Sequence, residues 1–433
     1  MVWVISAILA ILGGWALFNP FVGLIGVLLI VFVRPGELYP ALDAIHIQRS
    51  FTLLVLVSFL VHQRRLQLPR VSKALLVLWG AMFCTVPLAF WPGGAFGNCV
   101  DFGKVIMYHL LIVNLATTMR RFRIVLITIC GLVTWLAVWS SYLYYAGQFQ
   151  VRMGIERAVG LNSRTDDPNA LGITIVTALP LFLLFWRKEV GRLRWLMIPF
   201  TFLCVWTIVL TGSRTSYVVF AVLAIFYAFT QKYRVPMAAA MLVLLATLWF
   251  AMPDQYRARL ETIDNLSADG SYQGRVEAWG NAWKMFLGNP LTGVGVGEFS
   301  DVHGATTGHW LNVHSLYFQL LSETGLIGTV AFALFLVAVF RQNGLIRRQI
   351  KRMRNCPKWF RDYPLACDLA FVGLLFTGYS AHNLGRDTWY FFAGLTAAAG
   401  LLARKELLAL EKAPAPKSPA KADASAELAE VEA

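Results

Sequence analysis

Residues 195–230 read WLMIPFTFLCVWTIVLTGSRTSYVVFAVLAIFYAFT, and Arg214 is the only charged residue among them. The apolar runs on either side, 195–211 and 215–230, are each close to the roughly 20 residues that a helix needs to cross a bilayer. An arginine at mid-membrane costs about 2.5–3.5 kcal/mol on insertion scales. Either Arg214 extends to the interface, or it faces protein or an aqueous cavity. The stretch therefore predicts two membrane spans with a polar outer tip.

The rest of the chain is also largely apolar. Of its 433 residues, 58% are hydrophobic and 14% are charged, and the mean hydropathy is +0.60. Soluble domains carry about 25% charged residues, so the bilayer is the solvent for this protein. We expect an all-α, polytopic integral membrane protein with 12 or 13 transmembrane helices. The candidate spans are 2–18, 20–33, 50–62, 74–91, 105–118, 124–146, 169–186, 195–211, 215–230, 235–252, 315–340, 365–382 and 388–403.

The distribution of basic residues predicts the orientation. Alternate connections hold 26 of the 38 Lys and Arg, and cytoplasmic loops carry the excess of positive charge. These cytoplasmic segments are 62–73, 119–123, 187–194, 231–234, 341–364 and the tail from 404. The outer segments are then 147–168, the tip at 211–215 and 253–314. The threading of residues 1–33, as two short spans or a broken hairpin around Asn19-Pro20, stays open.

This orientation divides the chain into four regions. Residues 1–146 form N-terminal transmembrane helices, and 147–340 form a core that includes the periplasmic loop 253–314. Residues 341–404 comprise a cytoplasmic basic loop and the C-terminal transmembrane helices. Residues 405–433 are a cytoplasmic tail, which its Ala, Pro, Lys and Glu content predicts to be disordered from about 412.

Composition also excludes several classes of function. The net charge of +14 belongs to the cytoplasmic loops, and no basic patch interleaved with aromatic residues indicates nucleic-acid binding. The six cysteines form no CxxC pair and suit buried apolar positions. Because the N-terminus lacks a basic region before its apolar run, we expect it to stay as a membrane segment.

The long outer loop contains RVEAWGNAWKMFLGNP, residues 275–290. Val276, Trp279, Trp283 and Phe286 have helical spacing, which predicts an amphipathic helix on the outer membrane surface. Arg275 lies near its N-terminus, where free N–H groups favour anions. By itself, such an arginine is more often a solvated loop residue.

Two further outer stretches carry polar side chains. In VHSLYFQLLSETG, residues 313–325, His314 opens a span from the outside, and we expect Tyr317, one helical turn later, to lie on nearly the same face. Glu323 is half a helical turn out of phase with His314, so we expect it to pair with another helix. In ERAVGLNSRTDDPNALG, residues 156–172, the polar groups at the mouth of a span are Arg157, Arg164 and Asn169. DDPN is also typical of a turn and helix start.

Other motifs are weaker. GVGVGEF, residues 293–299, lacks the strand and helix that flank a dinucleotide-binding loop. His303, His309 and His314 are six and five residues apart, so they do not share a helical face as zinc ligands would. We expect no metal and no cofactor.

The outer motifs together resemble those of the bacterial O-antigen ligase and O-antigen polymerase family. The matching pieces are DPNALG at 167–172, GSRTS at 212–216, GR and AW within 274–279, NPLTGVGVGEF at 289–299 and HSLYFQLLSETG at 314–325. The resemblance covers residues 150–330. It implies transfer of a glycan from undecaprenyl diphosphate at the periplasmic face of the inner membrane. It also implies diphosphate-binding roles for Arg214 and Arg275, and an essential role for His314.

Elementary chemistry agrees with these roles. A diphosphate leaving group needs compensating positive charge, which planar guanidinium groups supply at any working pH. A sugar hydroxyl becomes a nucleophile as a base takes its proton, and histidine suits that role. We expect inverting, metal-independent transfer, with Arg157, Asn169, Tyr317 and Glu323 in supporting positions.

The acceptor is not determined by these residues. A ligase that uses lipid A-core is the first expectation, and an O-antigen or exopolysaccharide polymerase or a protein O-oligosaccharyltransferase would use the same donor motifs. The expected partners are the undecaprenyl-diphosphate-linked glycan, a glycan acceptor and membrane lipids, with no nucleic acid. A transporter or flippase is disfavoured, because such proteins place polar groups near the bilayer midplane.

Overall fold

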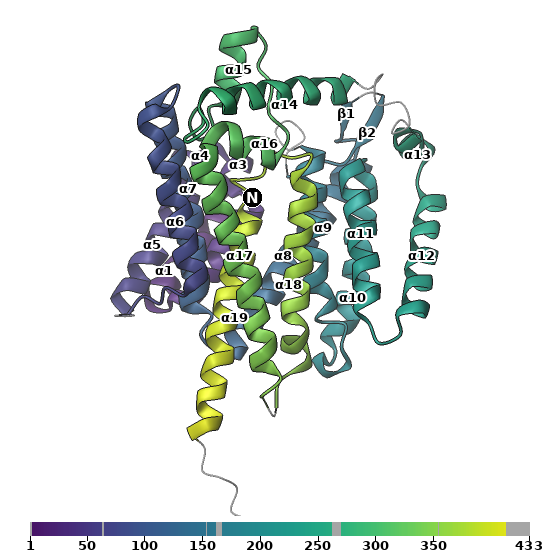
Figure 1. The fold of residues 1–433 in the computed structure, drawn as a ribbon. Coiled ribbons are helices and arrows are strands. Elements are labelled where there is room, and N and C mark those ends of the chain that lie inside the picture. The colour runs from purple at the N-terminus through teal and green to yellow at the C-terminus, as the bar shows by residue number, and fades with distance from the viewer. Residues whose placement is uncertain are drawn as a thin grey trace, which may run out of the picture.

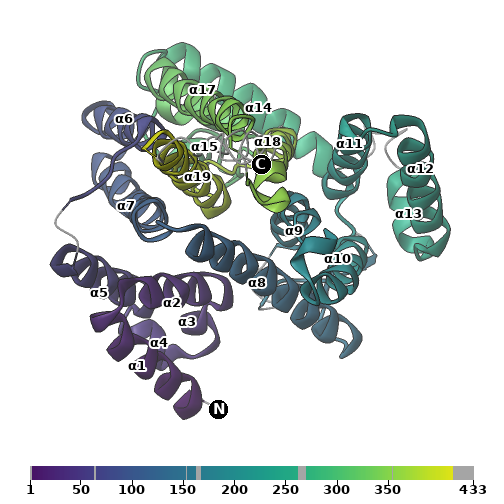
Figure 2. The same cartoon turned by 90° about the horizontal axis from the view of Figure 1, so that it is seen from below.

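The computed structural model describes residues 2–62, 65–152, 154–161, 167–261, 270–353 and 355–412. Arg164 and the tail from 413 lie outside these ranges. The chain forms a bundle of helices (Figures 1 and 2). The longer helices are α1 (Val2–Phe18), α2 (Pro20–Val33), α5 (Ile47–His62), α6 (Arg70–Thr85), α7 (Pro92–Leu115), α8 (Met119–Tyr145), α9 (Pro168–Leu183), α10 (Leu193–Leu210), α11 (Arg214–Thr230), α12 (Arg234–Ala251), α14 (Gly270–Gly288), α17 (Gly325–Ile350), α18 (Lys358–Gly378) and α19 (Asp387–Lys412).

The shorter elements lie mostly at one end of this bundle (Figure 1). They include α3 (Pro35–Leu38), α4 (Pro40–Ala44), α13 (Asp254–Glu261), α15 (Phe299–Thr307), α16 (Leu316–Gln319) and a π-helical turn η4 (Leu320–Thr324). The strands β1 (Gln150–Arg152) and β2 (Ile155–Arg157) form a two-stranded antiparallel ribbon. We call the end of the bundle that carries these shorter elements the decorated end.

The predicted fold class is confirmed. A helix occurs in each of the thirteen expected spans. Within the described ranges, six helices are long and apolar enough to cross a membrane, and five shorter helices are also apolar. The chain is therefore an all-α polytopic membrane protein.

Consecutive long helices run in opposite directions, so the connections fall into two groups. The segments predicted to face outward meet at the decorated end, while the basic connections and the C-terminal helix end lie at the other (Figure 1). This separation agrees with the basic-residue pattern. Which end faces which compartment remains a prediction.

The start of the chain is a helical hairpin. Asn19 caps α2 by accepting a hydrogen bond from the backbone N–H of Phe21 at 3.2 Å, and Pro20 is the first residue of that helix. The helices α1 and α2 pack on each other and on α5. Of the two alternatives for residues 1–33, the structure has two complete helices.

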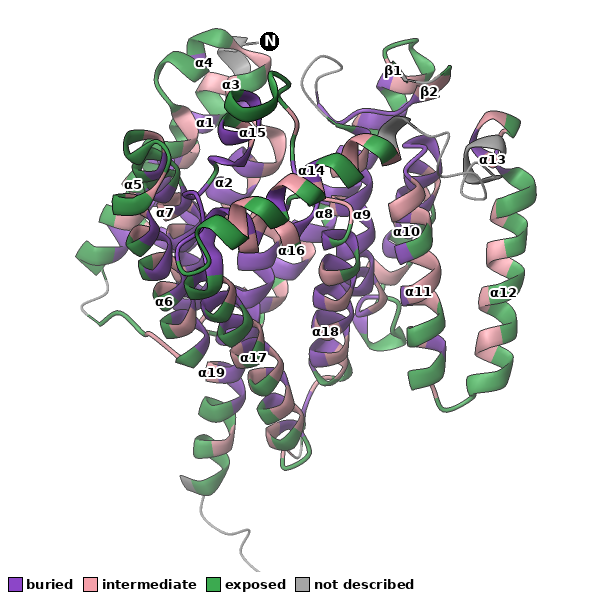
Figure 3. Ribbon diagram, turned by 45° about the horizontal axis from the view of Figure 1, so that its top comes forward, coloured by how far each residue is buried: buried purple, intermediate pink, exposed green. Residues whose placement is uncertain are grey.

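Packing is densest around α17, α18 and α19. The helix α17 contacts α6, α18 and α19, while α18 also packs on α9 and α11. In contrast, α12 has no buried residue and packs mainly on α11 (Figure 3). Its apolar sequence is consistent with a helix that lipid surrounds.

Several helices differ in extent from the predicted spans, and α7 begins as early as Pro92. The expected span 315–340 is divided into α16, η4 and α17, and the expected span 365–382 ends at Gly378. The helix α19 continues to Lys412, so the first residues of the predicted tail are helical. Pro168 begins α9 and Asp167 caps it by accepting from the N–H of Asn169, which confirms DDPN as a helix start.

Candidate functional site

The turn before Arg214 is tightly packed. Gly212 has a φ of 57°, and a Cβ there would lie 3.2 Å from the ring of Tyr256. Ser213 caps α11 by accepting from the N–H of Ser216. Arg214 is the first residue of α11, where the free N–H groups and the helix dipole favour an anion.

Arg157 holds this turn to the neighbouring elements. Its side chain is fully buried, its Nε donates to the carbonyl of Thr211 at 2.7 Å, and its Nη2 donates to Oδ1 of Asn169 at 2.8 Å. The guanidinium thus links β2, the turn before Arg214 and the start of α9. This arrangement fits the supporting roles expected for Arg157 and Asn169.

The helix α14 lies across the decorated end of the bundle (Figure 3). Its buried face comprises Ala278 and Ala282, while Val276 and Trp283 are exposed. Trp279 packs on protein, so only part of the expected apolar face is available to a membrane surface. The Nε1 of Trp279 donates to the carbonyl of Val313 at 3.0 Å. Arg275 lies one helical turn before Trp279.

His314 is not part of a helix. It precedes α16 and has a φ of 44°, in the left-handed region that few side chains other than Asn, Asp and His adopt. The expectation that Tyr317 shares a helical face with His314 is therefore wrong. Instead, the hydroxyl of Tyr317 donates to the carbonyl of Leu375 on α18 at 2.8 Å.

A short connection between α18 and α19 brings these elements together. Ser380 Oγ is 2.6 Å from Oγ1 of Thr215, the residue after Arg214. The ring of Tyr379 packs edge-on against Trp279, with centroids 5.3 Å apart. The ring of His382 packs against His314, with centroids 5.2 Å apart and an angle of 61° between the rings. Residues 379–382 thus touch His314 and the immediate surroundings of Arg214 and Arg275.

Hydropathy alone does not reveal this connection, because it places residues up to 382 in a span. The signal was present in the residues HNLGRD at 382–387, a polar run between two apolar segments. Solvent reaches the ring of His382, yet surrounding protein desolvates it enough to lower its pKa. The charge of Arg386 lowers that pKa further, and Asp167 raises it. Burial also lowers the pKa of Arg386, to about 10, so it stays charged at neutral pH.

The glycine-rich segment 293–299 has a structural role. The N–H groups of Val294 and Gly295 donate to the carbonyls of Ser322 and Glu323 at 2.8 and 3.1 Å. The N–H of Gly297 donates to the carboxylate of Glu323 at 3.0 Å, and Gln319 donates to the same oxygen at 3.1 Å. Glu323 thus meets another helix only at the first residue of α15, where the backbone of Phe299 also hydrogen-bonds its carboxylate. Its other partners are this loop and a residue one turn earlier.

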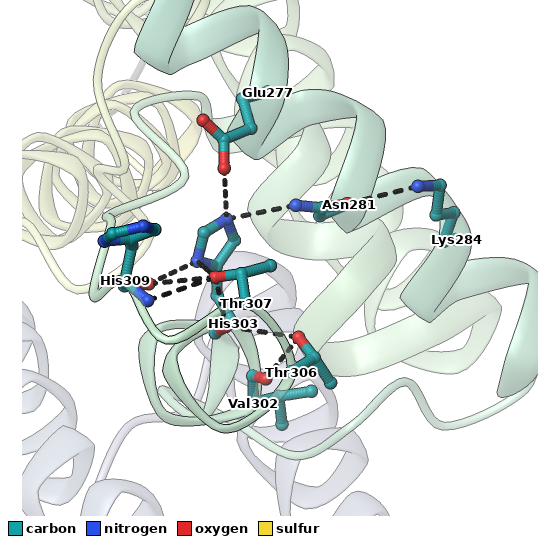
Figure 4. Close-up of polar contacts among 8 residues, drawn as sticks. All are labelled: Glu277, Asn281, Lys284, Val302, His303, Thr306, Thr307 and His309. Carbon is teal, nitrogen blue, oxygen red and sulfur yellow. Dashed lines mark hydrogen bonds and ion pairs between the residues drawn. The ribbon is translucent and has the colours of Figure 1, made fainter.

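Of the three histidines considered as zinc ligands, His303 lies on α15 and contacts the backbone of His309, which follows that helix (Figure 4). His303 is buried, its Nδ1 donates to the carbonyl of His309 at 2.6 Å, and its Nε2 is 3.1 Å from the amide nitrogen of Asn281. The Nε2 of His303 thus joins α15 to α14, and its Nδ1 holds the segment that follows α15. No group of three or more His, Cys, Asp or Glu that could hold a metal occurs within the described residues.

Comparison with known proteins agrees with the sequence resemblance. Residues 199–333 match the family model described as O-antigen ligase. No curated protein matches the chain. The matched region contains Arg214, Arg275, His314 and the glycine-rich segment, whereas Arg157 and the connection 379–386 lie outside it. The resemblance of this membrane protein to the O-antigen ligase and polymerase family is thereby confirmed over residues 199–333.

Proposed function

We propose that this protein is a glycosyltransferase that moves a glycan from undecaprenyl diphosphate to an acceptor hydroxyl at the periplasmic face of the inner membrane. The family match supports O-antigen ligase-type chemistry in general. The observation that carries the proposal is the contact of residues 379–382 with His314, Thr215 and Trp279. Two arginines and a histidine that are distant in sequence thereby belong to one region of the molecule.

In the proposed mechanism, Arg214 and Arg275 bind the diphosphate and offset its growing negative charge as the glycosidic bond breaks. His314 takes the proton of the acceptor hydroxyl as that oxygen attacks the anomeric carbon. Displacement in a single step inverts the configuration at this carbon. No residue is assigned to protonate the diphosphate, because it leaves as a stable anion.

Lipid A-core is the first candidate acceptor, which would make the protein an O-antigen ligase. A polymerase would use a growing glycan, and a protein O-oligosaccharyltransferase would use a side-chain hydroxyl. A transporter remains disfavoured, since the polar residues of the proposed site gather at one end of the bundle and not at its middle (Figure 1).

Substitution of His314 tests the proposal. Asn tolerates the left-handed backbone at this position but cannot take a proton, so His314→Asn should preserve the fold and lower transfer by about 10²–10⁴-fold. His314→Ala should lose as much activity and also some stability. The assay would follow transfer from lipid-linked glycan in liposomes, with a chelator present throughout.

Binding of the donor by His314→Asn should match the wild type. Near-normal turnover by this variant would contradict the proton-accepting role. Loss of wild-type transfer on addition of chelator would contradict the metal-independent mechanism.

A further inference from the structure

A polar cavity of about 570 Å³ lies next to His382. Its size is within the roughly 300–1,000 Å³ of small-molecule sites. Eight separate parts of the chain line it: the α2–α3 junction, α5, α7, α8, Gly160, the start of α9, Gln319, and residues 382–391. The N-terminal third, for which hydropathy predicts only membrane spans, thus contributes much of the wall.

Among the residues that the structure describes, the charges on this wall balance one another. Arg34, Lys104 and Arg386 face the cavity together with Glu37, Asp167 and Asp387. Three positive and three negative groups do not favour a diphosphate, which needs an excess of positive charge. Gln48, Gln319, Asn383, Thr174 and Thr388 add amide and hydroxyl groups. Such a mixture of donors and acceptors matches the hydroxyl groups of a sugar, each of which both donates and accepts.

Some of these groups have unused hydrogen-bonding capacity. The Nε of Arg386 is buried and has no hydrogen-bond partner within the described ranges, although its Nη1 donates to Thr174 Oγ1 at 3.0 Å. Lys104 makes no hydrogen bond or ion pair with any described residue. Leaving such groups unsatisfied in a membrane protein is costly. The cavity thus offers hydrogen-bond donors to a polar ligand.

The cavity also borders the proposed reaction centre. His382 lines it and packs on His314. Gln319 lines it as well, accepts from the N–H of Leu384 at 3.2 Å and donates to Glu323. Neither Arg214 nor Arg275 is part of the wall. A ligand here would thus reach His314 from the side of His382.

We propose that this cavity binds a sugar unit of the glycan substrates, through hydroxyl contacts with the balanced charged and amide groups of its wall. The inference rests on the proposed function, because it takes the substrates to be glycans. Attack opposite the leaving diphosphate favours the sugar of the acceptor. The sugar of the donor has the same chemistry, and the two are separated by experiment.

Gly385 offers a way to fill the cavity. It lies in the wall, its φ is not positive, and a Cβ added there would meet nothing within 4 Å. Gly385→Phe should therefore occupy the space of a sugar without displacing protein at the Cβ position. Gly80→Phe, at an exposed helical position with equally open surroundings, is the matched control for bulk. Lys104→Met removes one polar contact, and Lys73→Met at an exposed site on α6 is its control.

The test measures equilibrium binding to purified protein in nanodiscs. The probes are the lipid-linked glycan and the acceptor glycolipid extracted from the source bacterium, and undecaprenyl diphosphate without a sugar. Lys104→Met should weaken binding of one glycan probe about tenfold, the effect of losing a hydrogen bond to a charged group. Gly385→Phe should weaken binding of the same probe at least as much, because its ring fills the space of a sugar. Undecaprenyl diphosphate should bind all variants equally.

Each outcome has a consequence. Weaker binding of the acceptor glycolipid alone identifies the acceptor's sugar as the occupant, and weaker binding of the lipid-linked glycan alone identifies the donor's sugar. Unchanged binding of both glycan probes, or an equal loss for undecaprenyl diphosphate, would overturn the proposal. Because binding needs no turnover, these results are independent of whether His314→Asn abolishes transfer, which tests the proposed function itself.

Discussion

Arg275 and Arg214 are proposed to act through the geometry of their guanidinium groups. A guanidinium offers two parallel N–H donors to phosphate oxygens, whereas an ammonium is a compact point charge on a flexible chain. Arg214 has in addition the N-terminus of α11 beside it. Arg275 lies on α14, whose position depends on the contacts of Trp279.

Arg275→Lys should therefore be damaging although it preserves charge. We expect donor binding to weaken by about tenfold, the equivalent of one charge-assisted hydrogen bond. Titration of the purified protein with undecaprenyl diphosphate would measure this. Lys284→Arg, at an exposed position on the same helix, is the control. Equal affinity of Arg275→Lys and the wild type would show that charge alone suffices at this position.

His382 should make stability depend on pH. Its pKa is lowered from the ordinary value of 6.5 by desolvation and by Arg386, so the unfolded chain binds this proton more readily than the folded protein. The contribution of His382 to the free energy of unfolding is therefore complete above pH 6.5, and it decreases as the pH falls below that value. The melting temperature of the wild type should thus fall between about pH 7.5 and about pH 5.5, and that of His382→Gln should fall less.

The control for this experiment is His309→Gln, which changes an exposed histidine between α15 and α16. It shows how far the removal of an exposed histidine changes the melting temperature. A decrease of equal size in His382→Gln and the wild type would rule out His382 as its origin.

Among the elements, the glycine-rich segment and the π-helical turn η4 depend on each other. The carbonyls of Ser322 and Glu323 accept hydrogen bonds from the loop, while a π-helical turn departs from the regular helical hydrogen-bond pattern. Gly325, with a φ of 58°, then begins α17 against the carbonyl of Leu291. The contacts with this loop thus fix the position of Gly325, where the chain begins α17, the first of the last three long helices.

Gly293 is the most constrained point of this contact. Its φ is 66°, and an added Cβ would lie 2.5 Å from the carbonyl oxygen of Ser322. Gly293→Ala should lower stability by at least about 2 kcal/mol, because it adds both backbone strain and a steric clash. Thermal unfolding in detergent would detect the loss.

Gly308→Ala is the matched control, because Gly308 has a φ of 76° with nothing within 4 Å of an added Cβ. It should show the cost of the left-handed backbone alone, which is about 1 kcal/mol. Equal melting temperatures for the two variants would mean that the close approach at Gly293 relaxes without cost.

Across the molecule as a whole, the two ends of the bundle differ in charge and in structure. The decorated end carries α14, α15 and the ribbon β1–β2, and the other end carries most basic connections (Figure 1). Because cytoplasmic loops hold the positive charge, the decorated end should be periplasmic.

Reporter fusions at residues 265 and 350 should therefore show opposite sidedness. A periplasmic reporter should be active only at 265, and a cytoplasmic reporter only at 350. Fusion after residue 412 serves as the control and should behave like the fusion at 350, since α18 and α19 form one returning pair. The same side for 265 and 350 would contradict the orientation and with it the periplasmic site.

The fold class and the approximate position of each long helix follow from the order of residues alone. The reason is that a bilayer demands an apolar run of fixed length wherever a helix crosses it. Local chemistry also predicted the start of α9 at Asp167-Pro168. The resemblance to a known family pointed to Arg214, Arg275 and His314, because their motifs are short and continuous in sequence.

The contacts of these residues, in contrast, are set by tertiary packing. The left-handed backbone of His314, the partners of Glu323 and the role of residues 379–382 depend on segments between 26 and 165 residues apart. Helical periodicity describes one element at a time and therefore predicted the wrong relation between His314 and Tyr317. The balanced cavity beside His382 unites α2, α7, α9 and α19. No single one of its charged residues indicates the cavity in the sequence, because only the packing of the helices brings them to one wall.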